Sequence, residues 1–257
     1  MSTWTKTRRR HLSIIKEAAE EPLPRTLHLT KNGKTGVSVD FPPHVTCSPT
    51  RVCMGEGQQS ASCYALSGFM TYSNSVRCHA RNYRLATHLE TAPYQEVVRV
   101  ADDVWNRLHR GRDWIRWNGA GDLFPGACRI INAFTRRHSD VRVWVTSRKP
   151  DMVALLRDRR SLYLTLSLDK STPLKVGISL REQAARFKLA QAKLSYTRVA
   201  EDDQPPFDTW VVFNKHTGGT RYAWEHDAVC PATLPGASHE NACDVCRHCF
   251  GGKLEKR

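Results

Sequence analysis

The chain has 257 residues, with 39 Lys and Arg against 25 Asp and Glu, so its formal net charge is +14. Hydrophobic residues make up 40% of it, enough for a core, which excludes a wholly disordered chain. The sequence contains neither an apolar run of roughly 18–20 residues, as a membrane span needs, nor the apolar segment of a secretion signal. We therefore expect a cytoplasmic protein with no membrane partner. The positive charge favours nucleic acid or a nucleotide as partner.

The composition divides the chain into three regions. Residues 1–25 predict a basic N-terminal arm leading into a short helix over His11–Glu20. Residues 26–225 predict the main α/β domain, which includes a cysteine-containing loop near its start. Residues 226–257 are rich in Pro, Gly, His and Cys and lack an apolar period. They predict a small metal-binding appendix or a disordered tail.

Strands and helices alternate through the main domain. The expected strands are Gly36–Phe41, Asp113–Trp117, Val141–Thr146, Leu162–Leu168, Tyr196–Val199 and Trp210–Phe213. The expected helices are Ser75–Leu89, Tyr94–His109, Pro125–His138, one starting near Pro150, and Leu180–Ala192. Such alternation is typical of βαβ units in a mostly parallel sheet. We expect an α/β fold with a partial (β/α)6-type barrel, TIM-barrel-like, although the alternation alone also fits an open sheet.

Four cysteines near the C-terminus have the spacing of metal ligands. Cys230 is followed, after 12 residues, by Cys243, Cys246 and Cys249 at strict three-residue intervals. In a reducing compartment, clustered thiols bind metal more often than they form disulfides. The close run with one remote cysteine is typical of a [4Fe-4S] cluster. Zinc is the alternative, with His248 able to replace Cys249 as a ligand. We call these four cysteines the tail cysteines.

A second group of cysteines lies early in the chain. Cys47, Cys53 and Cys63, which we call the early cysteines, follow the first expected strand. Three thiolates leave one coordination position of a metal site open, as in reactive rather than structural sites. Cys78, on the next expected helix, is either a core residue or a fourth early ligand. Cys128 falls inside an expected helix and is most simply a buried small apolar residue.

A glycine-rich turn follows the second expected strand. In parallel α/β proteins ligands bind outside the carboxyl ends of the strands, where glycines let a ligand approach backbone N–H groups. The expected cofactor-binding residues are therefore Asn118, Gly119, Gly121 and Asp122. As an alternative, Asp122 caps the helix that starts at Pro125.

A cysteine-containing loop after the first strand of a partial barrel, with Tyr64 beside its last cysteine, resembles the radical S-adenosylmethionine enzymes. In that family three thiolates hold a four-iron cluster, and the fourth iron binds the amino and carboxylate groups of the cofactor. The resemblance implies that the early cysteines hold such a cluster and that Asp122 pairs with the cofactor ammonium. It also implies one-electron reduction of S-adenosylmethionine, followed by hydrogen abstraction from a substrate. The cysteine spacing here is wider than the usual pattern of that family, and Tyr64 follows Cys63 instead of preceding it.

Several short motifs also occur in the order found in the bacteriophage gene 88 protein family. They are an early cysteine pair, Cys63-Tyr64-Ala65, Arg81-Asn82, Gly121-Asp122-Leu123-Phe124, Val145-Thr146 and the tail cysteines. The resemblance spans roughly residues 35–250 and implies the fold and the metal sites, but no particular reaction. A phage origin would place the protein in the cytoplasm of a bacterial host.

These features predict an iron–sulfur protein with one or two [4Fe-4S] clusters. We expect it to resemble a radical S-adenosylmethionine enzyme acting on nucleic acid or nucleotides, with S-adenosylmethionine as cofactor. The tail cluster would be auxiliary: it would hold the C-terminal segment over the barrel mouth or relay electrons. The alternative is a non-catalytic nucleic-acid-binding protein stabilised by zinc or by a cluster.

Overall fold

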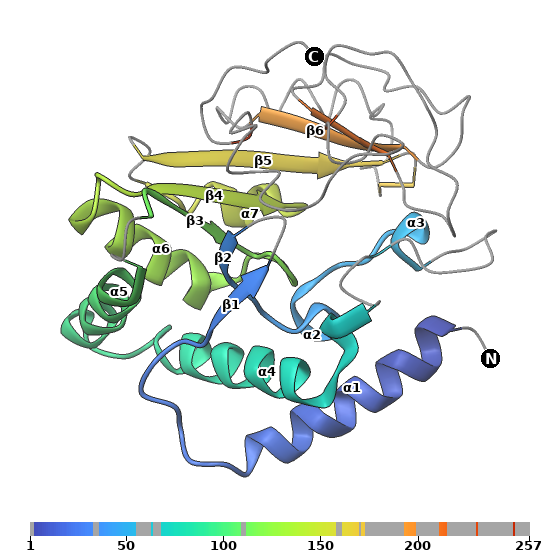
Figure 1. Ribbon diagram of the computed structural model, residues 1–257, viewed down its shortest axis with the longest axis horizontal. Coiled ribbons are helices and arrows are strands. Elements are labelled where there is room, and N and C mark those ends of the chain that lie inside the picture. Colours follow the sequence, from blue (N-terminus) through green and yellow to red (C-terminus); the bar gives the residue numbers. More distant parts are fainter. Residues whose placement is uncertain are drawn as a thin grey trace.

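The computed structural model describes residues 3–32, 36–54, 63, 68–108, 112–157, 161–169, 171–172, 193–198, 211–214, 230 and 249. These residues form a mixed α/β fold in which helices pack against a twisted sheet (Figure 1). The expected helix over Leu180–Ala192 lies outside the described residues.

Within the described residues the sheet has seven strands, whose order in space is their order in the chain. They are β1 (Leu29–Asn32), β2 (Gly36–Val39), β3 (Trp114–Trp117), β4 (Arg142–Ser147), β5 (Leu162–Leu168), β6 (Lys193–Arg198) and β7 (Val211–Asn214). The strands from β2 to β7 are parallel, and β1 pairs antiparallel with β2. The expected mostly parallel sheet is confirmed. In the described part of the chain β1 and β7 are the outer strands, so a barrel stays a prediction.

The helices lie mainly on one side of the sheet. They are α1 (Thr3–Ala19), α2 (Pro43–Thr46), α3 (Arg51–Met54), the 3-10 helix η2 (Gly68–Thr71), α4 (Ser73–His88), α5 (Tyr94–Leu108), α6 (Pro125–Arg137) and α7 (Pro150–Val153). Figure 1 shows α5 and α6 beside the sheet, α4 below them, and α1 along the outside of α4. The expected N-terminal arm is itself helical, because α1 begins at Thr3 rather than at His11.

Residue alternation along the strands decides which face meets the helices. Val143 and Val145 of β4 belong to the main core with α4, α5 and α6, whereas Trp144 lies on the opposite face. We call this opposite face the second face. Its side chains are mostly small and polar, apart from an aromatic cluster of Trp114, Trp144 and Tyr163. One face therefore supplies the hydrophobic core, and the other is free to carry polar chemistry.

The helical layer is tightly packed where α6 crosses α4. A Cβ added to Gly126 would collide with the backbone carbonyl of Ala86, so glycine is needed at this crossing. Five apolar residues of α5 recur at helical spacing and are buried: Val97, Val100, Ala101, Val104 and Leu108. None of the helices in the described residues combines the length and apolar character needed to cross a membrane.

Candidate functional site

Charged side chains follow the parallel strands at the edge where the strands end, which we call the carboxyl edge. Asp40 comes directly after β2, Arg148 after β4 and Asp169 after β5, and both carboxylates are buried. The carboxyl ends of parallel strands share one edge of a sheet, and in this class of fold that edge is where ligands bind. The carboxyl edge is therefore the candidate site.

The early cysteines lie in the segment that joins the end of β2 to α4. Burial raises the pKa of the Cys47 thiol well above its usual value, and Asp122, Cys63 and Cys53 act in the same direction, whereas Lys149 opposes them. The structure therefore brings the early cysteines within electrostatic range, Cys47 interacting with the other two. Among the described residues, no three His, Cys, Asp or Glu side chains converge closely enough to bind a single metal ion.

Cys53 sits in a hydrogen-bonded network with a buried ion pair. Arg148 Nη1 donates to Asp169 Oδ2 at 2.8 Å, and Thr50 Oγ1 donates to the same oxygen at 2.8 Å. The Thr50 hydroxyl also accepts a hydrogen bond from Cys53 N at 3.2 Å and lies 3.3 Å from Cys53 Sγ. Burial acts to lower the pKa of Arg148, but its interactions with Cys53 and Asp169 outweigh burial and raise this pKa. A permanent cation thus lies beside an early thiol.

Lys149 fastens the cysteine-containing segment to the turn after β3. Its Nζ donates to the backbone carbonyl of Thr46, next to Cys47, and to the carbonyl of Leu123 at 3.1 Å. The Thr46 hydroxyl in turn accepts a hydrogen bond from Asp122 N at 3.0 Å. Cys47 is therefore held in place by contacts from two strand-end loops.

The glycine-rich turn is filled by the chain itself. Ala120 N donates to Asp40 Oδ1 at 2.8 Å. A Cβ on Gly119 would collide with this same carboxylate oxygen, and one on Gly121 would lie 2.6 Å from Phe41 O. Gly121 also has a φ of +82°, a conformation that favours glycine. The glycines therefore let the end of β2 approach the turn, and the expected approach of a ligand stays a prediction.

Asp122 links the loop after β3 to the loop after β4 through hydrogen bonds. Its carboxylate accepts hydrogen bonds from Leu123 N at 2.7 Å, Ser147 Oγ at 2.5 Å and Arg148 N at 3.2 Å. Burial raises the pKa of Asp122, while these hydrogen bonds act to lower it. The helix α6 is preceded by Phe124, without a side-chain cap, so the alternative that Asp122 caps this helix is wrong.

Two side chains with buried polar atoms, those of the buried Asn118 and the half-buried Thr146, lie near the carboxyl edge with hydrogen-bonding capacity unused. Neither amide atom of Asn118 has a hydrogen-bond partner in the part of the chain that the structure describes, and the same holds for Thr146 Oγ1. Asn118 is only 3% exposed and has a φ of 60°. The sheet register pairs Trp117 of β3 with Val145 of β4. Asn118 and Thr146 are the next residues of these two chain segments, so they occupy equivalent positions side by side. Unpaired buried polar groups are costly, and a bound ligand is one way to satisfy them.

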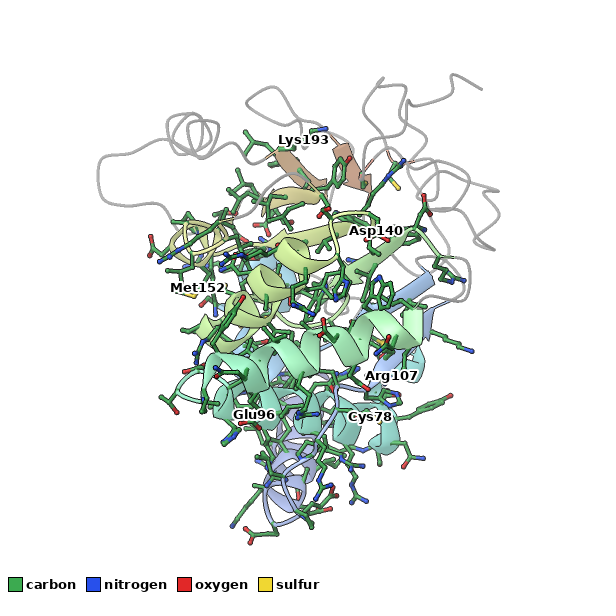
Figure 2. All side chains as sticks on the ribbon, turned by 90° about the vertical axis from the view of Figure 1, so that its left-hand side faces the viewer. Cys78, Glu96, Arg107, Asp140, Met152 and Lys193 are labelled. Atoms are coloured by element: carbon green, nitrogen blue, oxygen red, sulfur yellow. The ribbon has the colours of Figure 1, made fainter. Side chains whose placement is uncertain are left out.

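Cys78 lies away from this constellation, whereas Cys128 lies on α6 within electrostatic range of Asp122 and Lys149. Cys78 is on α4, where burial raises its pKa and its charged neighbours are Arg81 and Glu21. Figure 2 shows it in the helical layer, on the opposite side of the molecule from Lys193 of β6. Cys128 is 1% exposed on α6, and burial raises its pKa to about 12. The expectation that Cys128 is a buried small residue is confirmed.

The structure places two of the tail cysteines. Cys230 is buried, and Cys249 packs against the aromatic cluster of Trp114, Trp144 and Tyr163 on the second face. The other two, Cys243 and Cys246, lie outside the described residues. The aromatic cluster lies toward the amino ends of β3 and β5, whereas Asp169 marks the carboxyl edge. Tyr163 and Asp169 are six residues apart along extended chain, roughly 20 Å. Cys249 therefore lies toward the other end of the sheet from the early cysteines.

The sequence interpretation missed several residues of this constellation. They are Asp40, Thr50, Arg148, Lys149 and Asp169. A usable signal was present, because the carboxyl ends of parallel strands meet at one edge. Arg148 and Asp169 follow an expected strand within two positions, and Asp40 lies near the end of another.

An α/β fold with half-buried thiols and cations and buried carboxylates at the carboxyl edge defines a parallel-sheet protein with a candidate ligand-binding edge. The chain belongs to the bacteriophage Gene product 88 family, whose family model matches residues 6–252. No curated protein and no solved structure matches the chain. The expected membership of the gene 88 family is confirmed, and the resemblance to radical S-adenosylmethionine enzymes stays a prediction.

Proposed function

We propose that the protein is an iron–sulfur protein in which Cys47, Cys53 and Cys63 hold a [4Fe-4S] cluster with one open iron. We further propose that it acts on nucleic acid or nucleotides in the manner of a radical S-adenosylmethionine enzyme. The observation that carries the proposal is the electrostatic interaction of Cys47 with Cys53 and Cys63 after β2, with Arg148 close to Cys53 and Lys149 close to Cys47.

The electrostatics of this edge suit a thiolate-bound cluster. Burial and neighbouring negative groups keep the Cys47 thiol protonated in the metal-free protein, and metal binding releases such protons. Three thiolates would add negative charge to this half-buried site. The positive charges of Arg148 and Lys149 would partly offset it. Each thiolate of a four-iron cluster binds a different iron, so the sulfurs surround a volume instead of meeting at a point.

Of the side chains that the sequence suggested for a cofactor, Asn118 suits the role better than Asp122. The Asp122 carboxylate already accepts three hydrogen bonds from the protein, which leaves little capacity for a cofactor ammonium. Asn118 and Thr146, by contrast, have unused donors and acceptors at neighbouring strand ends. We assign polar contacts with S-adenosylmethionine to these two residues. When bound, the cluster and this cofactor together supply one-electron chemistry.

The sheet supports the same assignment. Six parallel strands follow one another in chain order, which is the strand order of an incomplete (β/α)6-type barrel. In such a barrel the second face is the interior, and the carboxyl edge is its mouth. The tail cysteines would hold a second metal, a [4Fe-4S] cluster or zinc, toward the opposite end of this interior.

A panel of single cysteine variants tests the early cluster. The full chain is purified anaerobically, and iron, acid-labile sulfide and zinc are measured per chain. Cys47→Ala, Cys53→Ala and Cys63→Ala should each lose about four iron atoms and four sulfides. The controls Cys78→Ala and Cys128→Ala should keep the iron of the unmodified protein. A colourless protein that contains zinc and no iron would contradict the proposal and favour a non-catalytic, zinc-stabilised nucleic-acid-binding protein.

A further inference from the structure

The first half of α1 is basic, whereas Lys16 and Glu17 at its end are followed by the acidic Glu20 and Glu21. Lys6, Arg8, Arg9 and Arg10 lie in its first half, all of them exposed, and we call this group the basic half of α1. The first turn of the helix contains no acidic residue. Cations at a helix N-terminus face the positive end of the helix dipole and are locally unfavourable. The arrangement therefore gains nothing for the stability of the helix.

The acidic residues Glu17, near the end of α1, and Glu21, just after it, form ion pairs within the molecule. Arg77 forms ion pairs with Glu17 and Glu21, each at 3.4 Å, and Arg81 lies 3.6 Å from Glu21. Arg84 donates to the backbone carbonyl of Glu21 at 2.7 Å. The arginines of α4 thus fasten α1 to the helical layer. Among the described residues, the basic half of α1 forms no ion pair of this kind, and Arg10 donates to the Ser73 hydroxyl at 3.1 Å.

The basic half of α1 lies on the side of the early cysteines. His11, which follows it, contacts the ring of His44 on α2, with ring centroids 5.0 Å apart. Arg8 contributes to lowering the pKa of His44, although burial is the larger cause. The helix α2 ends at Thr46, immediately before Cys47. Figure 1 likewise shows the N-terminal end of α1 extending toward α2 and α3.

We infer that the basic half of α1 binds the phosphodiester backbone of a nucleic acid and holds it next to the carboxyl edge. Four exposed cations on one helical segment match the repeated phosphates of such a chain, and the whole protein carries a net charge of +14. A membrane surface fits less well, because a membrane-bound helix needs an exposed apolar face. The apolar side of α1, with Ile14 and Ala18 buried, is already packed in the protein.

This inference rests on the nucleic-acid part of the proposed function, and not on the cluster. Its test compares two full-length triple variants with the same change in charge. Arg8→Gln, Arg9→Gln and Arg10→Gln together remove most of the basic half of α1. The control carries Arg99→Gln, Arg136→Gln and Arg157→Gln, three exposed cations on α5, on α6 and after α7.

Binding to a labelled 20-nucleotide single-stranded DNA, and to the same sequence as a duplex, is measured by fluorescence anisotropy at several salt concentrations. The basic-half variant should bind roughly 20- to 100-fold more weakly at low salt. The magnitude of its slope of log affinity against log salt should decrease by about 2–3, because each lost phosphate contact contributes roughly 0.7–0.9. The control should change affinity less than about threefold. Cys53→Ala should keep the affinity of the unmodified protein, whether or not a cluster is present.

Three outcomes would overturn the inference. Equal weakening in both triple variants would mean that overall charge, and not the basic half of α1, drives binding. Binding to phosphatidylserine vesicles but to neither DNA would assign the surface to a membrane. Loss of DNA binding in Cys53→Ala, with circular dichroism unchanged, would place the binding at the cysteine site. Absence of iron in the unmodified protein would refute the proposed cluster alone, since DNA binding is measured separately.

Discussion

Arg148 and Asp169 form a buried ion pair at 2.8 Å, in which the side chain of Arg148 is 19% exposed and that of Asp169 is fully buried. The pair joins the loop after β4 to the end of β5, and Thr50 extends it to Cys53. One hydrogen-bonded network therefore supports both the sheet edge and an early cysteine. Its integrity is the first condition for any chemistry at this edge.

Replacing one partner of this ion pair should strongly destabilise the folded protein. Arg148→Met leaves the Asp169 carboxylate buried without its cation, and such a loss typically costs about 3–5 kcal/mol of unfolding free energy. Urea unfolding followed by circular dichroism measures the change. The matched control is Arg137→Met, which breaks the exposed ion pair with Asp102 and should change stability little. Equal effects of the two substitutions would show that the Arg148–Asp169 pair is not held as described.

Gly121→Ala should disturb the early cysteines selectively. The new Cβ would lie 2.6 Å from Phe41 O and 2.7 Å from Thr46 Oγ1, at a φ of +82°. The strain should cost about 1–3 kcal/mol and displace the segment that leads into Cys47. Thermal unfolding measures the first effect, and iron per chain in anaerobic protein measures the second.

Gly126→Ala provides the comparison for that substitution. It forces α6 away from the carbonyl of Ala86, in the helical layer and away from the cysteines. It should lower the melting temperature, while the iron content of the folded fraction stays unchanged. If Gly126→Ala lost as much iron per folded chain as Gly121→Ala, the selective role of the glycine turn would be wrong.

Stability should fall on acidification because of His11. Burial lowers its pKa from the ordinary 6.5 to about 4, with Arg10 and His79 acting in the same direction. The unfolded chain binds this proton more readily, so stability is complete above about pH 6.5 and decreases as pH falls toward 4. The 2.5-unit difference corresponds to about 3 kcal/mol for this residue, which is 2% exposed.

His11→Phe should flatten the dependence of unfolding free energy on pH between 6.5 and 4. Urea titrations at several pH values measure it. His88→Gln is the control, because His88 is exposed and pairs with Glu96 on the helical surface. An unchanged slope in His11→Phe would show that this histidine is not the group that senses acid.

Loss of the tail metal should uncover the aromatic cluster of the second face. Trp114 is 1% exposed and Trp144 is 3% exposed, and Cys249 packs against them. A metal site depends on several thiolates at once, so Cys246→Ser should release the tail while the main domain stays folded. Acrylamide quenching of tryptophan fluorescence should then increase, but not in Cys78→Ser. Unchanged quenching and metal content in Cys246→Ser would exclude the tail site.

The local spacing of apolar residues was sufficient to predict the helices and strands in which that spacing is regular. The strand over Leu162–Leu168 and the helix starting at Tyr94 occur where the sequence indicates them. The edge strand β1 has only four residues, without clear alternation, and could not be recognised. The basic segment at the start of α1 has few apolar residues at helical spacing, so the sequence predicts an arm there. In the structure this segment is part of a helix that packs against α4.

The site was less predictable, because its contacts join residues far apart in sequence. The cysteines could be found by type and order, but not the buried partners that surround them. Asp122 is the instructive case: its position after a strand suggests a ligand contact or a helix cap. The actual partner, Ser147, is 25 residues away on the next strand. Only the register of the sheet brings the two together.

The most direct test of the early cluster is the iron and acid-labile sulfide content of a chain without the tail site. The variant with Cys243, Cys246 and Cys249 all changed to Ala is purified anaerobically and reconstituted with iron and sulfide. We predict about four iron atoms and four sulfides per chain, held by the early cysteines. A folded variant that retains no iron after removal of excess reagent would contradict the account.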